Sequence, residues 1–234
     1  MSENEGQEGM KIPLRYRLLN EFVQRVVGRV PAVEKMAALD RAAHIIKESK
    51  ALDFIGNSGR VLDVGTGPGH ILEKISEKVS EEVRVFGFDP WAKPFDSVRK
   101  RMGDGSHFVR AVAQSIPFAN DSFDVVTAFF VFHHIPKDEW SKIFDEIKRV
   151  AKPGAKLLLV EDTPRDEKES KLMKSWDRRS NVELQGKRSH MSVDEWKGFV
   201  EAMGCKVETV VNFSSHDSMT DKDIPHSNIV VSLP

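Results

Sequence analysis

Three glycines at alternate positions follow a short apolar run near residue 60. The run ends in Asp63-Val64 and leads into Gly65, Gly67 and Gly69, after which residues 70–79 have the apolar spacing of a helix. In a strand–turn–helix of this kind the missing Cβ atoms let a ligand lie against the backbone. The free N–H groups at the start of the helix favour a carboxylate or a phosphate. The segment therefore predicts a binding loop for a small charged ligand.

The glycine spacing differs from that of a dinucleotide-binding turn. A Gly-x-Gly-x-x-Gly turn would place its third glycine at position 70, where this chain has His70. Asp63 would repel a pyrophosphate but suits a ligand that carries a positive amine. Asp89 ends the next apolar run, where a doubly wound fold holds the two hydroxyls of a ribose. The pattern favours a nucleoside with an amine over a nicotinamide dinucleotide, so an NAD-dependent oxidoreductase is the weaker alternative.

Alternating strand and helix patterns must position these residues. The expected strands are 60–65, 83–89, 107–112, 123–130 and 155–161, and the expected helices between them are 70–79, 95–102 and 138–152. This alternation is typical of parallel βαβ units in a doubly wound sheet. Residues 192–204 predict a helix with a capping box of Ser192 and Glu195. Two strands, 205–213 and 227–233, are expected to form an antiparallel pair at the sheet edge.

The remaining segments divide the chain into parts. Residues 1–10 read as a disordered tail, 11–50 as an N-terminal helical cap, and 51–234 as one domain with an inserted lid at 163–190. The cap holds nine basic and four acidic residues, and the lid eight basic and five acidic, so both are basic although the whole chain is near neutral at 35 Lys+Arg against 36 Asp+Glu. This asymmetry favours an anionic or polar partner.

Composition excludes several classes of protein. The single cysteine, Cys205, cannot build a disulfide or a multi-cysteine metal site, and we expect it to pack in the core. We find no stretch of about 18 apolar residues, and the acidic, polar start is unlike a signal peptide. We therefore expect a cytoplasmic protein, without membrane contact, that is a monomer or homodimer.

Several motifs together resemble the class I S-adenosylmethionine-dependent methyltransferases, with the small-molecule enzymes of methyltransferase family 11 closest in pattern. The motifs are Asp63-x-Gly65-x-Gly67-x-Gly69, Asp89, Ile116-Pro117-Phe118, Ser122-Phe123-Asp124, Phe132-His133-His134-Ile135 and the stretch from Glu146 to Gly154. They span about residues 58–161. The resemblance implies a Rossmann-like, doubly wound seven-stranded sheet, mostly parallel with an antiparallel C-terminal hairpin, plus N-terminal helices, and S-adenosyl-L-methionine as the cofactor.

The resemblance also implies a set of cofactor contacts. The three glycines would lie under the methionine and ribose parts, with Asp63 near the amino group and Asp89 on the ribose diol. Where the family has an acid near the adenine amine, this chain has Val112, which leaves adenine recognition to its neighbours. The full expected set is Asp63, Gly65, Thr66, Gly67, Gly69, Asp89, Pro90, Ala113, Gln114 and Phe129, with Trp91 near the adenine.

The candidate catalytic residues follow the fourth and fifth strands. His133 and His134 follow the fourth strand, and Glu161 and Asp162 follow the fifth, where ligands of such sheets bind. Either histidine could act as a general base, and Glu161 is a candidate for substrate contact. Because we see no acid after the fourth strand to hold Mg²⁺, we expect metal-independent in-line methyl transfer. Further residues expected to close over the acceptor are Tyr16, Arg17, Trp176, Arg188 and His190.

The leading hypothesis is methylation of a small-molecule acceptor on O, N or C. The basic segments leave methylation of RNA or protein as an alternative within the same chemistry. A cofactor-binding protein without transfer activity is a second alternative, since a fold does not fix a function.

Overall fold

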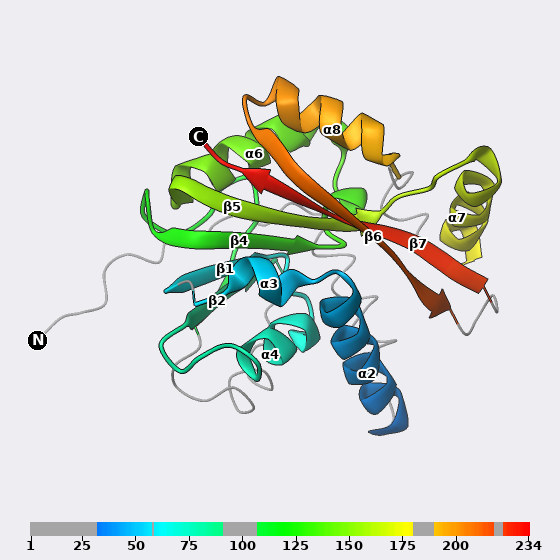
Figure 1. The fold of residues 1–234 in the computed structure, drawn as a ribbon, viewed down its shortest axis with the longest axis horizontal. Coiled ribbons are helices and arrows are strands. Elements are labelled where there is room, and N and C mark those ends of the chain that lie inside the picture. The colour runs from blue at the N-terminus through cyan, green and yellow to red at the C-terminus, as the bar shows by residue number, and fades with distance from the viewer. Residues whose placement is uncertain (1–31, 58, 91–106, 180–189, 218–221) are drawn as a thin grey trace, which may run out of the picture.

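The structure is a computed structural model that describes residues 32–57, 59–90, 107–179, 190–217 and 222–234. Seven strands form one sheet in the order β3-β2-β1-β4-β5-β7-β6 (Figure 1). They are β1 Arg60–Val64, β2 Arg84–Asp89, β3 His107–Arg110, β4 Phe123–Phe129, β5 Ala151–Asp162, β6 Lys206–Asp217 and β7 Lys222–Ser232. The pairs among β1 to β5 are parallel, and β7 is antiparallel to both β5 and β6. The predicted doubly wound sheet with an antiparallel C-terminal hairpin is confirmed.

Helices cover both faces of this sheet (Figure 1). Helices α2 Ala32–Glu48, α3 Ala51–Ile55 and α4 His70–Ser76 lie on one face, and α6 Trp140–Val150 and α8 Val193–Ala202 on the other. Helix α7 Glu167–Arg179 lies beside the hairpin formed by β6 and β7. Two short 3-10 turns, η1 Phe132–His134 and η2 Lys137–Glu139, connect β4 to α6.

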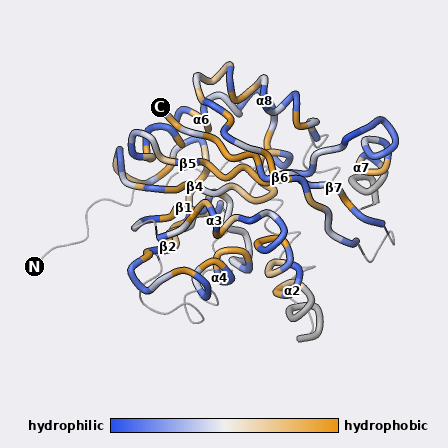
Figure 2. Tube along the Cα trace, viewed as in Figure 1, coloured by the Kyte–Doolittle hydropathy of each residue, from blue (hydrophilic) through white to orange (hydrophobic). Residues whose placement is uncertain are grey.

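The sheet is buried on both faces, which explains its nearly continuous apolar strands. Successive residues of β1 serve opposite cores: Val61 packs with α2, α3 and α4, and Leu62 packs with α6 and α8. The stacked indoles of Trp140 and Trp196, with ring centroids 4.8 Å apart, join α6 to α8. Hydrophobic residues accordingly concentrate along the central strands in Figure 2. No helix in the described part of the chain is long and apolar enough to span a membrane.

Local signals in the sequence account for most element boundaries. Ser192 and Glu195 form the predicted capping box at the start of α8, and Cys205 is buried as expected. Both hairpin strands are longer than predicted, because polar residues beyond the apolar runs continue the ladder through pairs such as Ser214 with Pro225. The short helix α3 was not predicted, and the expected helix at 95–102 lies outside the described residues.

Candidate active site

A cavity of about 380 Å³ opens at the carboxyl ends of β1, β2 and β4. This is the edge at which ligands of parallel sheets bind, and the volume lies in the range of small-molecule sites. Its walls are mostly apolar. Eight of the ten residues expected to contact the cofactor line it, namely Gly65, Thr66, Gly67, Asp89, Pro90, Ala113, Gln114 and Phe129.

The glycine loop forms one wall of the cavity. Gly65, Gly67 and Gly69 all have positive φ, at 68°, 53° and 78°. A Cβ atom on Gly65 would lie 2.8 Å from Val131, whereas one on Gly67 would meet no atom within 4 Å. Gly65 is thus required for packing, and Gly67 leaves open space beside its backbone. Gly69 does not line the cavity, because it caps α4 and donates its N–H to the Thr66 carbonyl at 2.9 Å.

Asp89 joins the end of β2 to the loop. Its Oδ2 accepts a hydrogen bond from the N–H of Gly67 at 2.9 Å, and the Thr66 N–H donates to the carbonyl of Phe88 at 3.0 Å. These two bonds fix the loop against β2, with the carboxylate of Asp89 on the cavity wall. The loop and the acid, 22 positions apart in the chain, therefore form one structural unit.

Asp63 lies behind the loop and does not line the cavity. It is 2% exposed, and its Oδ1 accepts a hydrogen bond from Thr127 at 2.7 Å. Burial raises the pKa of Asp63 to about 7, and the charge of Asp89 adds to the rise, while hydrogen bonds from Thr127 and Thr66 oppose it. A nearby cation would favour the ionised carboxylate.

The expected adenine region surrounds the segment after β3. Val112, Ala113 and Gln114 all line the cavity, and Val112 forms an isolated bridge with Ser115. The Gln114 amide donates to the carboxylate of Glu139, so this side chain is held in place across the loop. Trp91 lies outside the described residues.

Helix α2 forms one wall of the cavity, although the contacts expected from the N-terminal segment were at other residues. Ala38, Arg41, Ala42 and Ile45 line the cavity from this helix. The helical spacing and basic charge of residues 11–50 were the sequence features that pointed to this helix. The contacts expected there, Tyr16 and Arg17, lie outside the described residues, as does Arg188. His70 and Ile71 at the start of α4 also line the cavity and were not predicted.

The three candidate catalytic residues lie next to one another. His134 lines the cavity, and its Nε2 is 3.1 Å from Nε2 of His133, which is buried. Nδ1 of His133 is 2.6 Å from Oε2 of Glu161, whose Oε1 accepts the N–H groups of Val131 and Phe132 at 2.8 and 2.7 Å. Burial raises the pKa of Glu161 to about 8. Glu161 therefore holds the turn after β4 from behind and does not itself line the cavity.

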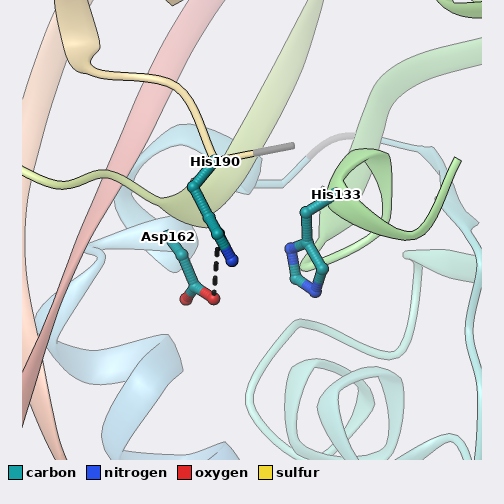
Figure 3. A group of neighbouring side chains, drawn as sticks. All are labelled: His133, Asp162 and His190. Atoms are coloured by element: carbon teal, nitrogen blue, oxygen red, sulfur yellow. Dashed lines mark ion pairs between the residues drawn. The ribbon is translucent and has the colours of Figure 1, made fainter. Parts of the chain in front are cut away.

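Asp162 is also turned away from the cavity. Its Oδ1 is 2.8 Å from Nδ1 of His226 on β7, and its Oδ2 is 3.8 Å from Nδ1 of His190. Figure 3 shows the side chain of His190 between those of Asp162 and His133. Burial favours a higher pKa for Asp162, but the hydrogen bond from His226 and the charges of the nearby histidines outweigh burial and hold that pKa well below its usual range. His190, expected in the lid, thus joins a buried polar cluster.

Phe129 and Phe130 both line the cavity, as expected for aromatic residues at the end of β4. Phe130 adopts a φ of 57°, which is uncommon for a bulky residue. Its N–H donates to the Val160 carbonyl at 2.8 Å, and its ring packs edge-on against His226 at 5.0 Å. This conformation turns the chain from β4 into the histidine-bearing turn.

Comparison with known proteins agrees with this arrangement. Residues 61–154 match the family described as "Methyltransferase domain". The ubiquinone/menaquinone biosynthesis C-methyltransferase of Geotalea daltonii is 32% identical over 114 residues, which cover 46% of this chain and 48% of that protein. The same-named enzyme of Desulfotalea psychrophila is 30% identical over 149 residues, or 62% of this chain and 58% of that protein. The matches therefore span only about half the length of these curated relatives.

A solved structure extends the likeness over nearly the whole chain. The 1,6-didemethyltoxoflavin-N1-methyltransferase of Burkholderia thailandensis, solved with 1,6-didemethyltoxoflavin and S-adenosylhomocysteine, aligns with a TM-score of 0.67 over 96% of this chain and 92% of that one. The sequence identity is 15%, so this likeness concerns the fold.

Proposed function

We propose that this chain, in which residues 61–154 match a methyltransferase domain, is a class I S-adenosylmethionine-dependent methyltransferase that methylates a small-molecule acceptor. The observation that carries this proposal is the cavity at the carboxyl edge of the sheet, where the glycine loop and Asp89 meet. When bound, S-adenosylmethionine would supply a methyl group on a positively charged sulfur, and the acceptor atom would bond to the methyl carbon as the carbon–sulfur bond breaks in line with it.

The residues present fit this cofactor. Open space beside Gly67 leaves room for a ligand against the loop backbone. Asp89 offers a carboxylate for a ribose diol, and a charge-assisted hydrogen bond of that kind contributes about 1.5–3 kcal/mol. The apolar neighbours Phe88, Val112 and Ala113 suit the faces of an adenine ring. Asp63, buried behind the loop, would favour the methionine ammonium through its charge.

The acceptor end of the cavity is assigned to the turn after β4. His134 is the titratable side chain from this turn on the cavity wall, and the contact with His133 at 3.1 Å holds its ring. We assign to His134 the hydrogen bond that orients the acceptor atom, with Phe129 and Phe130 as the apolar walls beside it. Holding the acceptor in line with the methyl group is the main contribution that a methyltransferase makes to rate.

The lining favours an acceptor with an apolar body and one polar or anionic group. Among the described residues that line the cavity, Arg41 is the only Lys or Arg. The other walls are mainly apolar. The proteins named above as similar act, by their names, on quinone precursors and on 1,6-didemethyltoxoflavin. They support a small organic acceptor, and the whole chain's substrate is a proposal on this basis.

Isotope transfer from labelled cofactor tests the proposal. The full chain is incubated with S-adenosylmethionine carrying a labelled methyl group and with separate small-molecule, RNA and protein fractions of a cell extract. We expect S-adenosylhomocysteine and one labelled product in the small-molecule fraction, with His134→Ala binding cofactor normally but transferring more slowly. Label found only in the RNA or protein fraction would contradict a small-molecule acceptor. Cofactor binding without any transfer would contradict an enzymatic role.

A further inference from the structure

Two adjacent carboxylates at the end of β5 are buried together. Glu161 and Asp162 are 1% and 7% exposed. Their ion-pair partners among the described residues are all imidazoles, those of His133, His190 and His226, at 2.6, 3.8 and 2.8 Å. A buried carboxyl group that is ionised needs compensating positive charge. Protons on the imidazoles supply it in one arrangement, and a divalent cation bound by the same imidazoles supplies it in another.

Three of these residues form a ligand set. His133, Asp162 and His190 each offer one donor atom, and the three atoms lie within 4.8 Å of one another (Figure 3). With metal–ligand bonds of about 2.0–2.1 Å, donor atoms in a tetrahedral zinc site are roughly 3.4 Å apart. Oδ2 of Asp162 and Nδ1 of His190 are already 3.8 Å apart. Small side-chain rotations would bring the set to bonding distances.

Polar contacts behind the ligands hold two of them in orientation. His226 engages Oδ1 of Asp162, and its own Nε2 is 2.7 Å from Oγ of Ser215, which leaves Oδ2 facing His190. Glu161 contacts His133 and is itself fixed by backbone N–H groups. Carboxylates and other polar groups commonly orient metal ligands in this way.

We propose that His133, Asp162 and His190 bind one divalent transition-metal ion of the Zn²⁺ type. Two imidazoles and one carboxylate suit Zn²⁺ or Co²⁺, whereas Mg²⁺ prefers oxygen ligands and retains several waters. The ligands come from η1, the end of β5 and the residue two positions before the α8 N-cap, so the ion ties the start of α8 to the turn that carries His134. None of the three lines the cavity, but His133 contacts His134, so a bound ion would act on the proposed acceptor site through that contact.

Cobalt substitution in the tag-free full chain tests this site. The protein is treated with a chelator, dialysed, and titrated with Co²⁺ while its visible absorption is recorded, and Zn²⁺ content is measured separately by mass spectrometry. We expect one ion per chain, a cobalt band that Zn²⁺ abolishes and excess Mg²⁺ does not, and a higher unfolding temperature with metal. A folded wild-type protein that takes up no ion would overturn the proposal and leave protonated imidazoles as the compensating charge.

Variants separate this site from surface histidines. His190→Ala and Asp162→Asn should each weaken Co²⁺ binding at least tenfold, with folding checked by circular dichroism. The matched control is His216→Ala, because His216 is an exposed histidine paired with Asp223 at 3.4 Å. This control should bind Co²⁺ as the wild type does. Unchanged binding in His190→Ala, the variant with the smaller effect on packing, would contradict the assignment, as would a loss in His216→Ala.

Discussion

The cavity and the buried histidine–carboxylate cluster (His133, Glu161, Asp162, His190 and His226) lie at the same edge of one sheet but are built differently. The cavity depends on backbone conformation: three glycines with positive φ and one acid that accepts a loop N–H. The cluster depends on side chains that four separate segments bring together.

The two regions therefore constrain the sequence in different ways. A site made of backbone tolerates few residue types at each position, because any Cβ atom changes the space or the strain. A site made of side chains depends on charge compensation, so its members are coupled to one another more than to the local chain. Variants in the two regions should therefore fail in different ways, the first in ligand binding and the second in metal uptake.

The largest expected effect is on the cavity, from Gly67→Val. The substitution places a β-branched side chain at φ 53° and in the open space beside the loop. We expect S-adenosylmethionine affinity to fall by roughly 100-fold or more, measured by calorimetry. Gly154→Val is the matched control, because Gly154 also has positive φ and open space but lies away from the cavity. Equal losses in both variants would attribute the effect to instability.

Asp89→Ala should have the next largest effect. It removes the carboxylate from the cavity wall and the acceptor for the Gly67 N–H. A lost charge-assisted hydrogen bond of about 1.5–3 kcal/mol corresponds to at least tenfold weaker cofactor binding. Glu208→Ala, which removes an exposed acid paired with Lys156, should leave the affinity unchanged. Retained affinity in Asp89→Ala would remove this residue from the site.

Gly87→Ala should weaken the support beneath the loop. A Cβ atom at this position in β2 would lie 2.3 Å from Oγ1 of Thr66 and 3.0 Å from Leu72. Overpacking of this kind lowers the free energy of unfolding by about 1–3 kcal/mol, measurable by urea denaturation. Gly198→Ala on α8 is the control: its Cβ meets no atom within 4 Å, so it should stabilise the helix slightly. An unaffected Gly87→Ala protein would show that Thr66 moves freely.

Asp63 should produce an effect of a different kind, a change in the pH dependence of stability. Its pKa is about 7 in the folded protein against an ordinary value of 3.8 for aspartate, so the folded state holds a proton that the unfolded chain releases between these values. This contribution to stability therefore falls as pH rises from about 4 to about 7. Asp63→Asn should remove that component, and urea titrations at several pH values measure it. Identical pH slopes in the two proteins would contradict the raised pKa.

Sequence reasoning could predict the fold because its signals are local. The parallel βαβ units follow from alternating strand and helix patterns, and the capping box of Ser192 and Glu195 set the start of α8. The resemblance drawn from the glycine loop and the histidine motif agrees with the match of residues 61–154 to the family described as "Methyltransferase domain". The loop residues that line the cavity could be predicted because they are neighbours along the chain.

The cluster could not be predicted because its contacts are not local. His190 and Asp162 come together only when α8 packs on the sheet, and His226 reaches Asp162 only because β7 pairs antiparallel with β5. Asp63 and Gly69, expected at the cofactor, lie outside the cavity lining for a related reason: side-chain direction and capping decide such contacts. Their proposed roles rest on the resemblance.

The most direct test of the central claim is a crystal structure of the chain with S-adenosylhomocysteine. The account predicts the ligand in the cavity, with its ribose hydroxyls on Asp89 and its backbone contacts at Gly65 to Pro68. A ligand bound elsewhere, or a cavity that stays empty at saturating ligand, would contradict it.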